Sequence, residues 1–544
     1  MNCIPSRGPR AFPPVPSVPS VRARTRALAL WAPALACASW ALILLAAAPG
    51  AANAQEKQPT MSMSETHAKT RVRAVVEASP SQNGRWDTLP YEMPINPVHV
   101  ALMHTGKVLV VSGSGNDPDN HVLQAAVWDP KSGTIKTFPI AWDMFCDGMV
   151  VLPDGRPFVL GGTLQYDPFF GEPRTAAFNP LSEKFVNMPS MGGGRWYPTG
   201  TVLGDGSVLV DSGKNKDGSM NRAVQIWTGK AWSAAGAAFA DIDLYPRQHL
   251  LPDGKVFEDG YNPNSQLYDP ASHAFTPVAT TIFAQDRFAG TSVLLPLTPA
   301  NAFKPKVMIL GGASPATATT ELIDLSVPSP KWVQGPPMVK GRVELNATIL
   351  PDGKVLVSGG SVNDEDNATA VKEAQLYDPQ GNTFGSASTM EFPRLYHSNT
   401  LLLPDATVAS LGGNPERKTY QPEIEIYSPP YLFKADGTPA KRPAITGAAP
   451  RISYGARFAV RTADAANVKS VVLIRAGAAT HAFDMEQRLV GLSFTAGKGV
   501  LQATAPANGN LAPPGYYLLF ILNAEGVPSV ARFVHLGRAA AGKH

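Results

Sequence analysis

A hydrophobic run, a turn built on Pro-Asp-Gly and a second hydrophobic run recur along most of this 544-residue chain. The clearest copies are Leu152-Pro-Asp-Gly155, Leu251-Pro-Asp-Gly254 and Leu350-Pro-Asp-Gly353. The turn positions, including three weaker copies, are residues 106, 155, 206, 254, 353 and 406, which lie 48 to 53 residues apart except for one gap of 99. That gap holds a degenerate copy around residues 292–312. The chain therefore contains seven units.

A period near 50 residues with several short strands per unit is typical of a kelch-type propeller blade. Within a unit, a doubled glycine such as Gly359-Gly360 and a later Asp-Pro such as Asp378-Pro379 mark where strands end, because Asp-Pro does not extend a ladder. We predict an all-β chain with a seven-bladed kelch-type β-propeller over residues 84–433. Short alternating strands without this period follow over residues 440–537 and predict an immunoglobulin-like β-sandwich.

The first 54 residues have the pattern of an export signal. Residues 1–26 carry five arginines and no acid, residues 27–48 are almost wholly apolar, and Ala52-Asn53-Ala54 offers a small-residue cleavage site. The alternative is an uncleaved membrane anchor, since 22 apolar residues are long enough to span a bilayer. Residues 55–83 are polar and aperiodic and predict a flexible lead.

Removing the signal changes the charge and the cysteine count. The formal net charge of +4 depends on the five signal arginines, so the remaining chain is close to neutral, and nothing in it indicates nucleic-acid binding. Cys146 is then the one cysteine left. A single cysteine in an exported protein is an inert buried thiol, an intermolecular link or part of a reactive site.

The repeat predicts which residues meet on the propeller axis. Seven positions before the turn's proline position stand five residues with chemically active side chains: Cys146, Tyr197, Tyr245, Glu344 and His397. The innermost strand of each blade starts beside the axis, so we expect these side chains to form a ring at one mouth of the channel, which Pro97 and Ala289 complete. Phenolate and imidazole are good ligands for copper(II). The alternative is that the aromatic residues and the cysteine only pack there.

Five separated motifs in this order resemble those of the copper radical oxidases, the group of glyoxal oxidase and galactose oxidase. They are Phe145-Cys146, Arg195-Trp-Tyr-Pro-Thr199, Leu395-Tyr-His-Ser-Asn399, Glu425-Ile-Tyr-Ser-Pro-Pro-Tyr-Leu432 and Ala479-Thr-His481. The resemblance covers about residues 84 to 537 and is closer to glyoxal oxidase because of the Arg-Trp-Tyr-Pro motif.

The resemblance implies a role for each matching residue. Cys146 and Tyr197 would be joined by a thioether, and the modified tyrosine would bind copper and carry a radical. Tyr396 would be the axial tyrosine that takes the substrate's proton, and His397 and His481 would be the copper imidazoles. The implied reaction is the two-electron oxidation of an aldehyde or primary alcohol, with dioxygen reduced to hydrogen peroxide.

Three departures from the family pattern stand out. Galactose oxidase stacks a tryptophan over its cross-linked tyrosine, and the matching position here is Asn215. The chain must therefore shield the radical with another aromatic residue, such as Tyr261 or Tyr166, or shield it poorly. The sugar-binding residues of galactose oxidase have no convincing match, which argues against galactose. Asp147 stands where glyoxal oxidases usually have a small residue.

Arginines near the ring give the one hint about substrate. Arg195, Arg247, Arg342 and Arg394 recur at or close to ring positions. With Glu344, they are candidate substrate-binding residues, because guanidinium groups match the geometry of a carboxylate such as that of glyoxylate. The alternative is that they pair with acids of their own blades.

A non-catalytic kelch propeller that binds glycan or protein at the cell surface is the rival interpretation, because fold alone does not determine function. The oxidase interpretation predicts a small aldehyde or alcohol and dioxygen as reaction partners. It also predicts an exported monomer, located in the periplasm, outside the cell or at the cell surface, with membrane contact only if the signal is retained.

Overall fold

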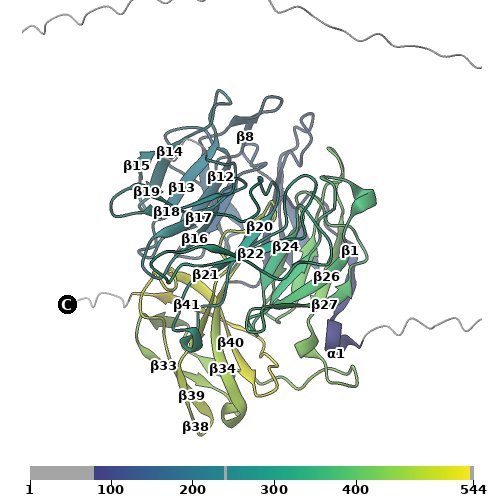
Figure 1. The fold of residues 1–544 in the computed structure, drawn as a ribbon, viewed down its shortest axis with the longest axis vertical. Helices are drawn as coiled ribbons and strands as arrows, with labels where there is room; N and C mark the ends of the chain where they lie inside the picture. The colour runs from purple at the N-terminus through teal and green to yellow at the C-terminus, as the bar shows by residue number, and fades with distance from the viewer. Residues whose placement is uncertain (1–78, 238–241, 539–544) are drawn as a thin grey trace, which may run out of the picture. The chain divides into compact units, whose positions relative to one another are not determined.

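The computed structural model describes residues 79–237 and 242–538, and these residues are almost entirely β-structure (Figure 1). The expected export signal lies outside the described residues. One α-helix of four residues, α1 (Pro80–Asn83), precedes the first strand, so the end of the expected flexible lead is ordered. Four short 3-10 helices also occur, at η1 (Pro299–Asn301), η2 (Asn367–Thr369), η3 (Pro430–Leu432) and η4 (Ala465–Asn467). None of the helices in the described part of the chain has the length and apolar character needed to cross a membrane.

Seven antiparallel units of four strands follow one another along the chain. Each innermost strand contacts the innermost strands of the two neighbouring units, and the seventh contacts the first, so the units form a closed ring. From the first unit to the seventh, the innermost strands are β2 (His99–Leu102), β6 (Gly148–Val151), β12 (Trp196–Val202), β16 (Arg247–Leu250), β20 (Thr291–Leu294), β24 (Asn346–Ile349) and β28 (Asn399–Leu402). The second strands are β3 (Val108–Gly113), β7 (Pro157–Leu160), β13 (Val208–Lys214), β17 (Val256–Asp259), β21 (Lys306–Leu310), β25 (Val355–Ser358) and β29 (Val408–Leu411).

The outer strands complete each unit. The third strands are β4 (Gln124–Asp129), β10 (Thr175–Asn179), β14 (Ala223–Trp227), β18 (Asn264–Asp269), β22 (Thr320–Asp324), β26 (Glu373–Asp378) and β30 (Glu423–Ser428). The outermost are β5 (Thr134–Pro139), β11 (Lys184–Met188), β15 (Trp232–Ala237), β19 (Ala274–Thr280), β23 (Trp332–Gln334), β27 (Thr383–Thr389) and, in the seventh unit, β1 (Arg85–Glu92). Because β1 pairs with β30, the N-terminal strand closes the ring through pairs such as Trp86 with Tyr427.

The glycines and aspartates of the repeat form the turns and strand ends that the sequence predicts. Gly155, Gly254 and Gly353 adopt positive φ angles of 86°, 94° and 88°, which glycine reaches at little cost. The turn aspartates accept hydrogen bonds from the backbone two residues on, as Asp253 Oδ1 does from the Lys255 amide at 3.0 Å. The third strands that precede Asp-Pro end on that aspartate, as β26 ends at Asp378. The prediction of strand ends is therefore confirmed.

Burial decreases outward through each unit. Strand β2 is buried at every position, whereas only parts of β5 are covered. The C-terminal part contributes two further sheets, with strand orders β31-β33-β39-β38 and β32-β41-β40-β34-β37. Their strands are β31 (Gly447–Ala448), β32 (Arg451–Ser453), β33 (Arg457–Arg461), β34 (Val468–Arg475), β37 (Leu489–Leu492), β38 (Phe494–Gly497), β39 (Val500–Thr504), β40 (Gly515–Asn523) and β41 (Arg532–Gly537).

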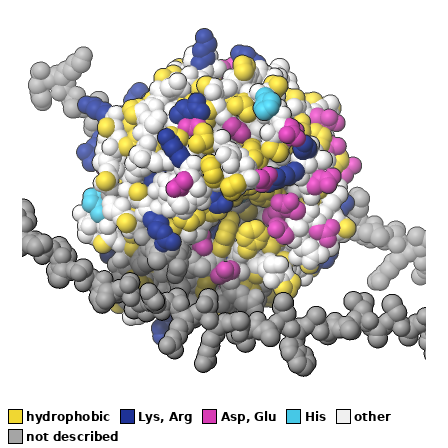
Figure 2. Space-filling model, turned by 90° about the horizontal axis from the view of Figure 1, so that it is seen from above, with side chains coloured by type: hydrophobic (Ala, Val, Ile, Leu, Met, Phe, Trp, Pro, Cys, Tyr) yellow, Lys and Arg dark blue, Asp and Glu magenta, His cyan; other side chains and the backbone are white. Residues whose placement is uncertain are grey.

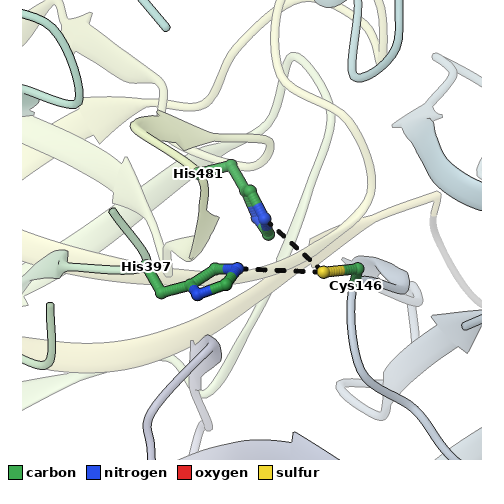
Figure 3. Close-up of side chains that lie close together, drawn as sticks. All are labelled: Cys146, His397 and His481. Atoms are coloured by element: carbon green, nitrogen blue, oxygen red, sulfur yellow. Dashed lines mark hydrogen bonds between the residues drawn. The ribbon is translucent and has the colours of Figure 1, made fainter. Parts of the chain in front are cut away.

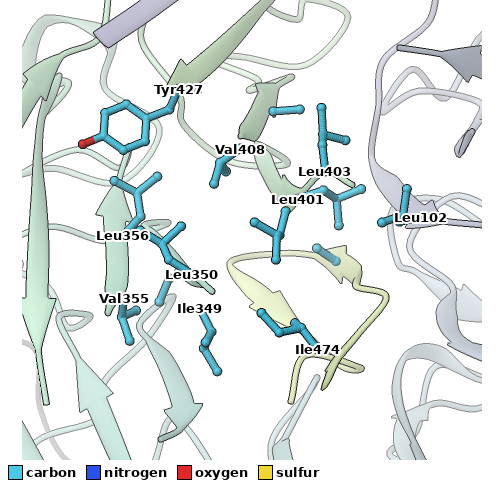
Figure 4. Close-up of a cluster of buried hydrophobic side chains, with 14 of the residues drawn as sticks. Leu102, Ile349, Leu350, Val355, Leu356, Leu401, Leu403, Val408, Tyr427 and Ile474 are labelled. Carbon is cyan, nitrogen blue, oxygen red and sulfur yellow. The ribbon is translucent and has the colours of Figure 1, made fainter. Parts of the chain in front are cut away.

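The C-terminal sheets share hydrophobic cores with the ring. Ile474 and Phe520 lie in the same buried cluster as Leu350, Leu401 and other residues of the sixth and seventh units (Figure 4). A second cluster joins Phe458 and Leu473 to strands of the fourth and fifth units. Burial of this apolar surface holds the C-terminal part against the ring.

Candidate metal centre

The ring positions predicted from the repeat share one backbone conformation. Six of the seven have a positive φ angle: Cys146 (58°), Tyr197 (67°), Tyr245 (46°), Ala289 (49°), Glu344 (61°) and His397 (63°). Pro97, the seventh, has its φ fixed near −65° by its own ring. Left-handed backbone is uncommon for residues with a side chain and costs about 1–3 kcal/mol each, so it persists only where the surroundings impose it.

Backbone hydrogen bonds tie neighbouring ring positions together. The Tyr197 amide donates to the Cys146 carbonyl at 3.1 Å, and the Tyr245 amide donates to the Tyr197 carbonyl at 3.0 Å. The Glu344 amide likewise donates to the Ala289 carbonyl at 2.6 Å. In these three pairs the left-handed residue of one unit thus bonds directly to that of the next, and this contact places their side chains around the axis.

Three of the predicted site residues converge on one point (Figure 3). The Sγ atom of Cys146 lies 3.8 Å from Nε2 of His397 and 3.7 Å from Nε2 of His481. The ligand atoms of this group all lie within 4.8 Å of one another. The Tyr197 hydroxyl lies 2.8 Å from Nε2 of His481, so a phenol oxygen joins the two imidazoles.

His481 reaches this point on a hairpin from the C-terminal part. Strand β35 (Ala478–Thr480) pairs with β2 of the first unit and with β36 (Phe483–Asp484), which extends the first sheet toward the axis. His481 and Ala482 form the tip of the hairpin, with φ angles of 47° and 66°. This pairing brings His481 from the C-terminal part to the innermost strand of the first unit.

Both imidazoles are held so that Nε2 faces the site. Nδ1 of His397 lies 2.5 Å from Oδ1 of Asn414, and Nδ1 of His481 lies 2.6 Å from the Thr480 hydroxyl. Burial lowers the pKa of His397 to about 3 and that of His481 well below its ordinary value. The rings are therefore neutral at physiological pH, the form in which histidine ligates a metal, and outer hydrogen bonds of this kind orient metal-binding histidines.

Tyr396 stands beside these ligands. Its ring centroid lies 3.7 Å from that of His397 and 5.2 Å from that of His481. Burial raises the pKa of Tyr396 well above that of a free phenol, while Arg417 acts in the opposite direction. Without a cation, the tyrosine therefore holds its proton. Two imidazoles and two phenols are a donor set that suits copper(II), so the residues present fit the group that the sequence motifs imply.

The aromatic shield is not one of those expected from the sequence. Trp196 stacks on Tyr197 with centroids 3.8 Å apart and an interplanar angle of 15°, and Phe169 stacks on the far side of Trp196 at 4.2 Å. Tyr166 packs on Phe145 instead, and Tyr261 packs on Phe288. Neither covers the Tyr197 ring, so the expectation for both was wrong. The shield comes from the residue next to the tyrosine.

Cys146 and Tyr197 belong to one buried cluster, which also holds Trp196 and Tyr245. Burial, together with Asp143 and Asp147, raises the pKa of the Cys146 thiol. Asp147 is itself buried beneath the ring, with Oδ1 3.1 Å from Nδ1 of His99, and its burial raises its pKa to about 6. A carboxyl group therefore lies on the channel side of the site, opposite the mouth.

The four arginines proposed from the sequence point away from the site into their own units. Arg195, Arg247, Arg342 and Arg394 are at most 1% exposed. Each donates to backbone carbonyls, as Arg394 does to Gly412 at 3.1 Å and Arg342 does to Gly359 at 3.2 Å. Acids of the same unit pair with two of them, such as Glu425 with Arg394 at 2.8 Å. The alternative of local pairing accounts for these contacts, and Glu344 alone of the proposed substrate-binding residues faces the ring.

Sequence reasoning missed the residues that orient the ligands. Asn414 stands in none of the five motifs, and Thr480 is part of Ala479-Thr-His481 but was given no role of its own. His99 was also missed. The available signal was its position two residues after Pro97, at the start of an innermost strand. Trp196 was part of the motif containing Tyr197, and its role depends on the left-handed turn that stacks adjacent rings.

An all-β ring with a buried cluster of two imidazoles, two phenols and a thiol defines a metal-dependent redox protein. The family model of the glyoxal oxidase N-terminus matches residues 116–431, and that of the galactose oxidase-like early set domain matches residues 442–536. The chain belongs to the glyoxal oxidase family, and it is an oxidoreductase of the copper radical oxidase class.

Individual relatives agree over most of the chain. A galactose oxidase of Gibberella zeae is 27% identical over 496 residues, which cover 83% of this chain and 70% of the relative. An aldehyde oxidase GLOX of Vitis pseudoreticulata is 28% identical over 536 residues, which cover 85% and 99%. A solved structure of a fungal alcohol oxidase in complex with copper has a TM-score of 0.74 at 26% identity, covering 83% of this chain and 99% of that chain.

Proposed function

We propose that this protein oxidises a small aldehyde or primary alcohol by two electrons and passes those electrons to dioxygen, which forms hydrogen peroxide. The observation that carries the proposal is the meeting of His397 Nε2, His481 Nε2, the Tyr197 hydroxyl and the Cys146 sulfur at one buried point. An alcohol loses two electrons and two protons to become an aldehyde, and a hydrated aldehyde loses the same to become an acid.

Tyr197, Tyr396, His397 and His481 are the proposed copper ligands. When bound, copper supplies a one-electron acceptor and a Lewis-acidic position for a substrate oxygen. Tyr197, joined to Cys146 by a thioether, is the second one-electron acceptor. Forming that bond removes the thiol hydrogen and one ring hydrogen of Tyr197, and dioxygen is the oxidant.

The chain's own residues divide the remaining work. Tyr396 accepts the proton of the substrate hydroxyl, because its ring lies against His397 and its buried phenol is a strong base once deprotonated. The oxidised Tyr197 accepts a hydrogen atom from the substrate carbon. Trp196 covers the Tyr197 ring and keeps water and reductants from it.

The mass of one pair of peptides tests this proposal. After copper and air are supplied, the peptides containing Cys146 and Tyr197 should appear as one linked species that has lost two hydrogens, with peroxide formed from an aldehyde or alcohol. Cys146→Ser is the control and should give two separate peptides. A free Cys146 thiol in copper-treated wild type would contradict the proposal and favour a non-catalytic binding module, an alternative that the family membership also argues against.

The surrounding architecture belongs to the same proposal. We propose that the seven units are blades of a kelch-type propeller over residues 84–433, because they have four strands each and close through β1. Residues 440–537 are proposed to be an immunoglobulin-like sandwich of two sheets. We further propose that residues 1–54 direct export and that the enzyme acts outside the cytoplasm as a monomer.

A further inference from the structure

The charge at the channel mouth does not come from the blade arginines, because their guanidinium groups are buried and bonded within the units. Arg287, at the same register in the fifth unit, is likewise paired with Glu321 at 2.6 Å. Three acids of the sixth unit, Glu344, Asp364 and Glu365, lie close enough to act on one another electrostatically.

Glu344 is the buried member of this group of acids. It occupies the ring position of the sixth unit, is 4% exposed and has a left-handed backbone. The backbone amide of Tyr396, the proposed proton acceptor, lies near its carboxyl group. Its Oε2 atom has no hydrogen-bond partner among the described residues. A buried carboxylate oxygen without a donor is costly, so a donor from outside the chain that binds there would be favoured.

Two exposed acids stand above Glu344 on the connection between β25 and β26. Burial raises the pKa of the Glu344 carboxyl group, and Asp364 and Glu365 lie close enough to raise it further electrostatically. Asp364 and Glu344 also act on the Tyr261 hydroxyl, which places that ring at the same side of the mouth. On the face that carries the β8–β9 hairpin (Thr163–Gln165 and Phe170–Gly171), Asp and Glu side chains gather on one side, next to hydrophobic ones (Figure 2).

One cation near this group, Arg417, is already paired with another acid. Arg417 lies within electrostatic range of Tyr396 and Glu365, but its guanidinium is held by both oxygens of Asp167, at 2.6 and 2.9 Å. It lies over the rings of Tyr166 and Phe169, on the side of the second unit. Like charges repel an anionic substrate from the acidic side, whereas an ammonium group would satisfy the free oxygen and gain from all three carboxylates.

We propose that the mouth recognises a substrate that carries a protonated primary amine close to the reacting alcohol or aldehyde carbon, with Glu344 Oε2 accepting from the ammonium and Asp364 and Glu365 attracting it. The inference rests on the proposed oxidase function, whose substrate class it names. It replaces the carboxylate-bearing substrate expected from the arginines, since none of the four faces the mouth.

Three substrates that share one reacting group test the charge preference. They are 2-aminoethanol, ethylene glycol and glycolate, which are cationic, neutral and anionic at neutral pH. The expected order of kcat/KM is cation, neutral, anion, and the advantage of the cation should shrink as salt is added. Glu344→Gln should lower the ratio of cation to neutral kcat/KM by about tenfold. Glu525→Gln, an exposed acid of the C-terminal part, is the matched control and should leave the ratio unchanged.

Titration calorimetry on the copper-free protein gives a second readout that needs no turnover. 2-Aminoethanol should bind to wild type and to Glu525→Gln, and binding should be lost in Glu344→Gln; without copper, the amine has no metal to ligate. Equal kcat/KM for glycolate and 2-aminoethanol, or amine binding unchanged by Glu344→Gln, would overturn the inference and leave the oxidase intact. Peroxide absent with all three substrates, together with a free Cys146 thiol, would instead refute the proposed function.

Discussion

The ring residues and the neighbouring arginines stand within a few positions of each other in the repeat, yet their side chains point in opposite directions and have different roles. Six of the seven ring residues have a left-handed backbone that turns the side chain to the axis. Arg195, Arg342 and Arg394 turn back into their units, where the backbone carbonyl accepts from the glycine pair of the preceding unit, as that of Arg394 does from the Gly360 amide at 2.7 Å. Its guanidinium bonds to the glycine pair of its own unit.

The repeated backbone arrangement therefore places reactive side chains around the axis and, a few residues away, places arginines that hold neighbouring units together. The glycine pair has no side chain in the way of the approaching strand; a Cβ on Gly311 would lie 2.5 Å from the Arg342 carbonyl. The arginines therefore join consecutive units. Changes at the ring should affect the reaction with little effect on stability, and changes at the arginines should do the reverse.

The largest effect should follow Tyr197→Phe, which removes the hydroxyl that contacts His481 Nε2. Peroxide production should fall by about 10³-fold or more, because a residue with a direct role in the reaction is lost. Tyr245→Phe is the matched control at the next ring position, where the hydroxyl donates to the Asp147 carbonyl at 2.5 Å. A similar loss in both variants, measured with a peroxide-coupled assay, would break the distinction between the two ring tyrosines.

Arg394→Met should lower the free energy of unfolding by about 3–5 kcal/mol, because it leaves the Glu425 carboxylate buried without its cation. The folded fraction should still bind copper with the affinity of wild type. Chemical denaturation and copper titration provide the two measurements. Adding Glu425→Gln should recover part of the stability, whereas a stable Arg394→Met protein with altered substrate preference would show that the arginine belongs to the active site.

Asn414→Ala should weaken copper binding by about 10- to 100-fold, since Nδ1 of His397 loses the oxygen that orients it. The measurement is a competition titration with a copper chelator. Asn367→Ala, at an exposed position, should bind copper as wild type does. Unchanged affinity in Asn414→Ala would mean that packing alone orients the imidazole.

The smallest effect concerns acid stability of the copper-free protein. The pKa of His397 is lowered to about 3 in the folded state, so between pH 6.5 and 3 the unfolded chain binds more protons and stability falls as pH falls. Between pH 7.5 and pH 5, this residue should cost about 2 kcal/mol. Denaturation of wild type should show the loss, and His397→Gln should show a shallower pH dependence; equal slopes would contradict the assigned burial.

The repeat made much of the architecture predictable, because its turns and glycines are local signals. Register alone placed Cys146, Tyr197 and His397 on one ring, since units that repeat in sequence repeat in space. The same reasoning was misleading for the arginines. Register predicts where along its unit a residue lies, but it does not predict the direction of a long side chain, which depends on tertiary hydrogen bonds. Trp196 and Asn414 were out of reach, because their roles depend on adjacent rings stacking and on a loop that returns to His397.

The hairpin that carries His481 makes assembly of the proposed copper site depend on a segment that follows all seven units in sequence. The ring can supply three of the proposed ligands, but the fourth arrives only when the hairpin of β35 and β36 has been made and has paired with β2. A chain that lacks this hairpin has no means of generating a radical that would damage it or the machinery that is folding it.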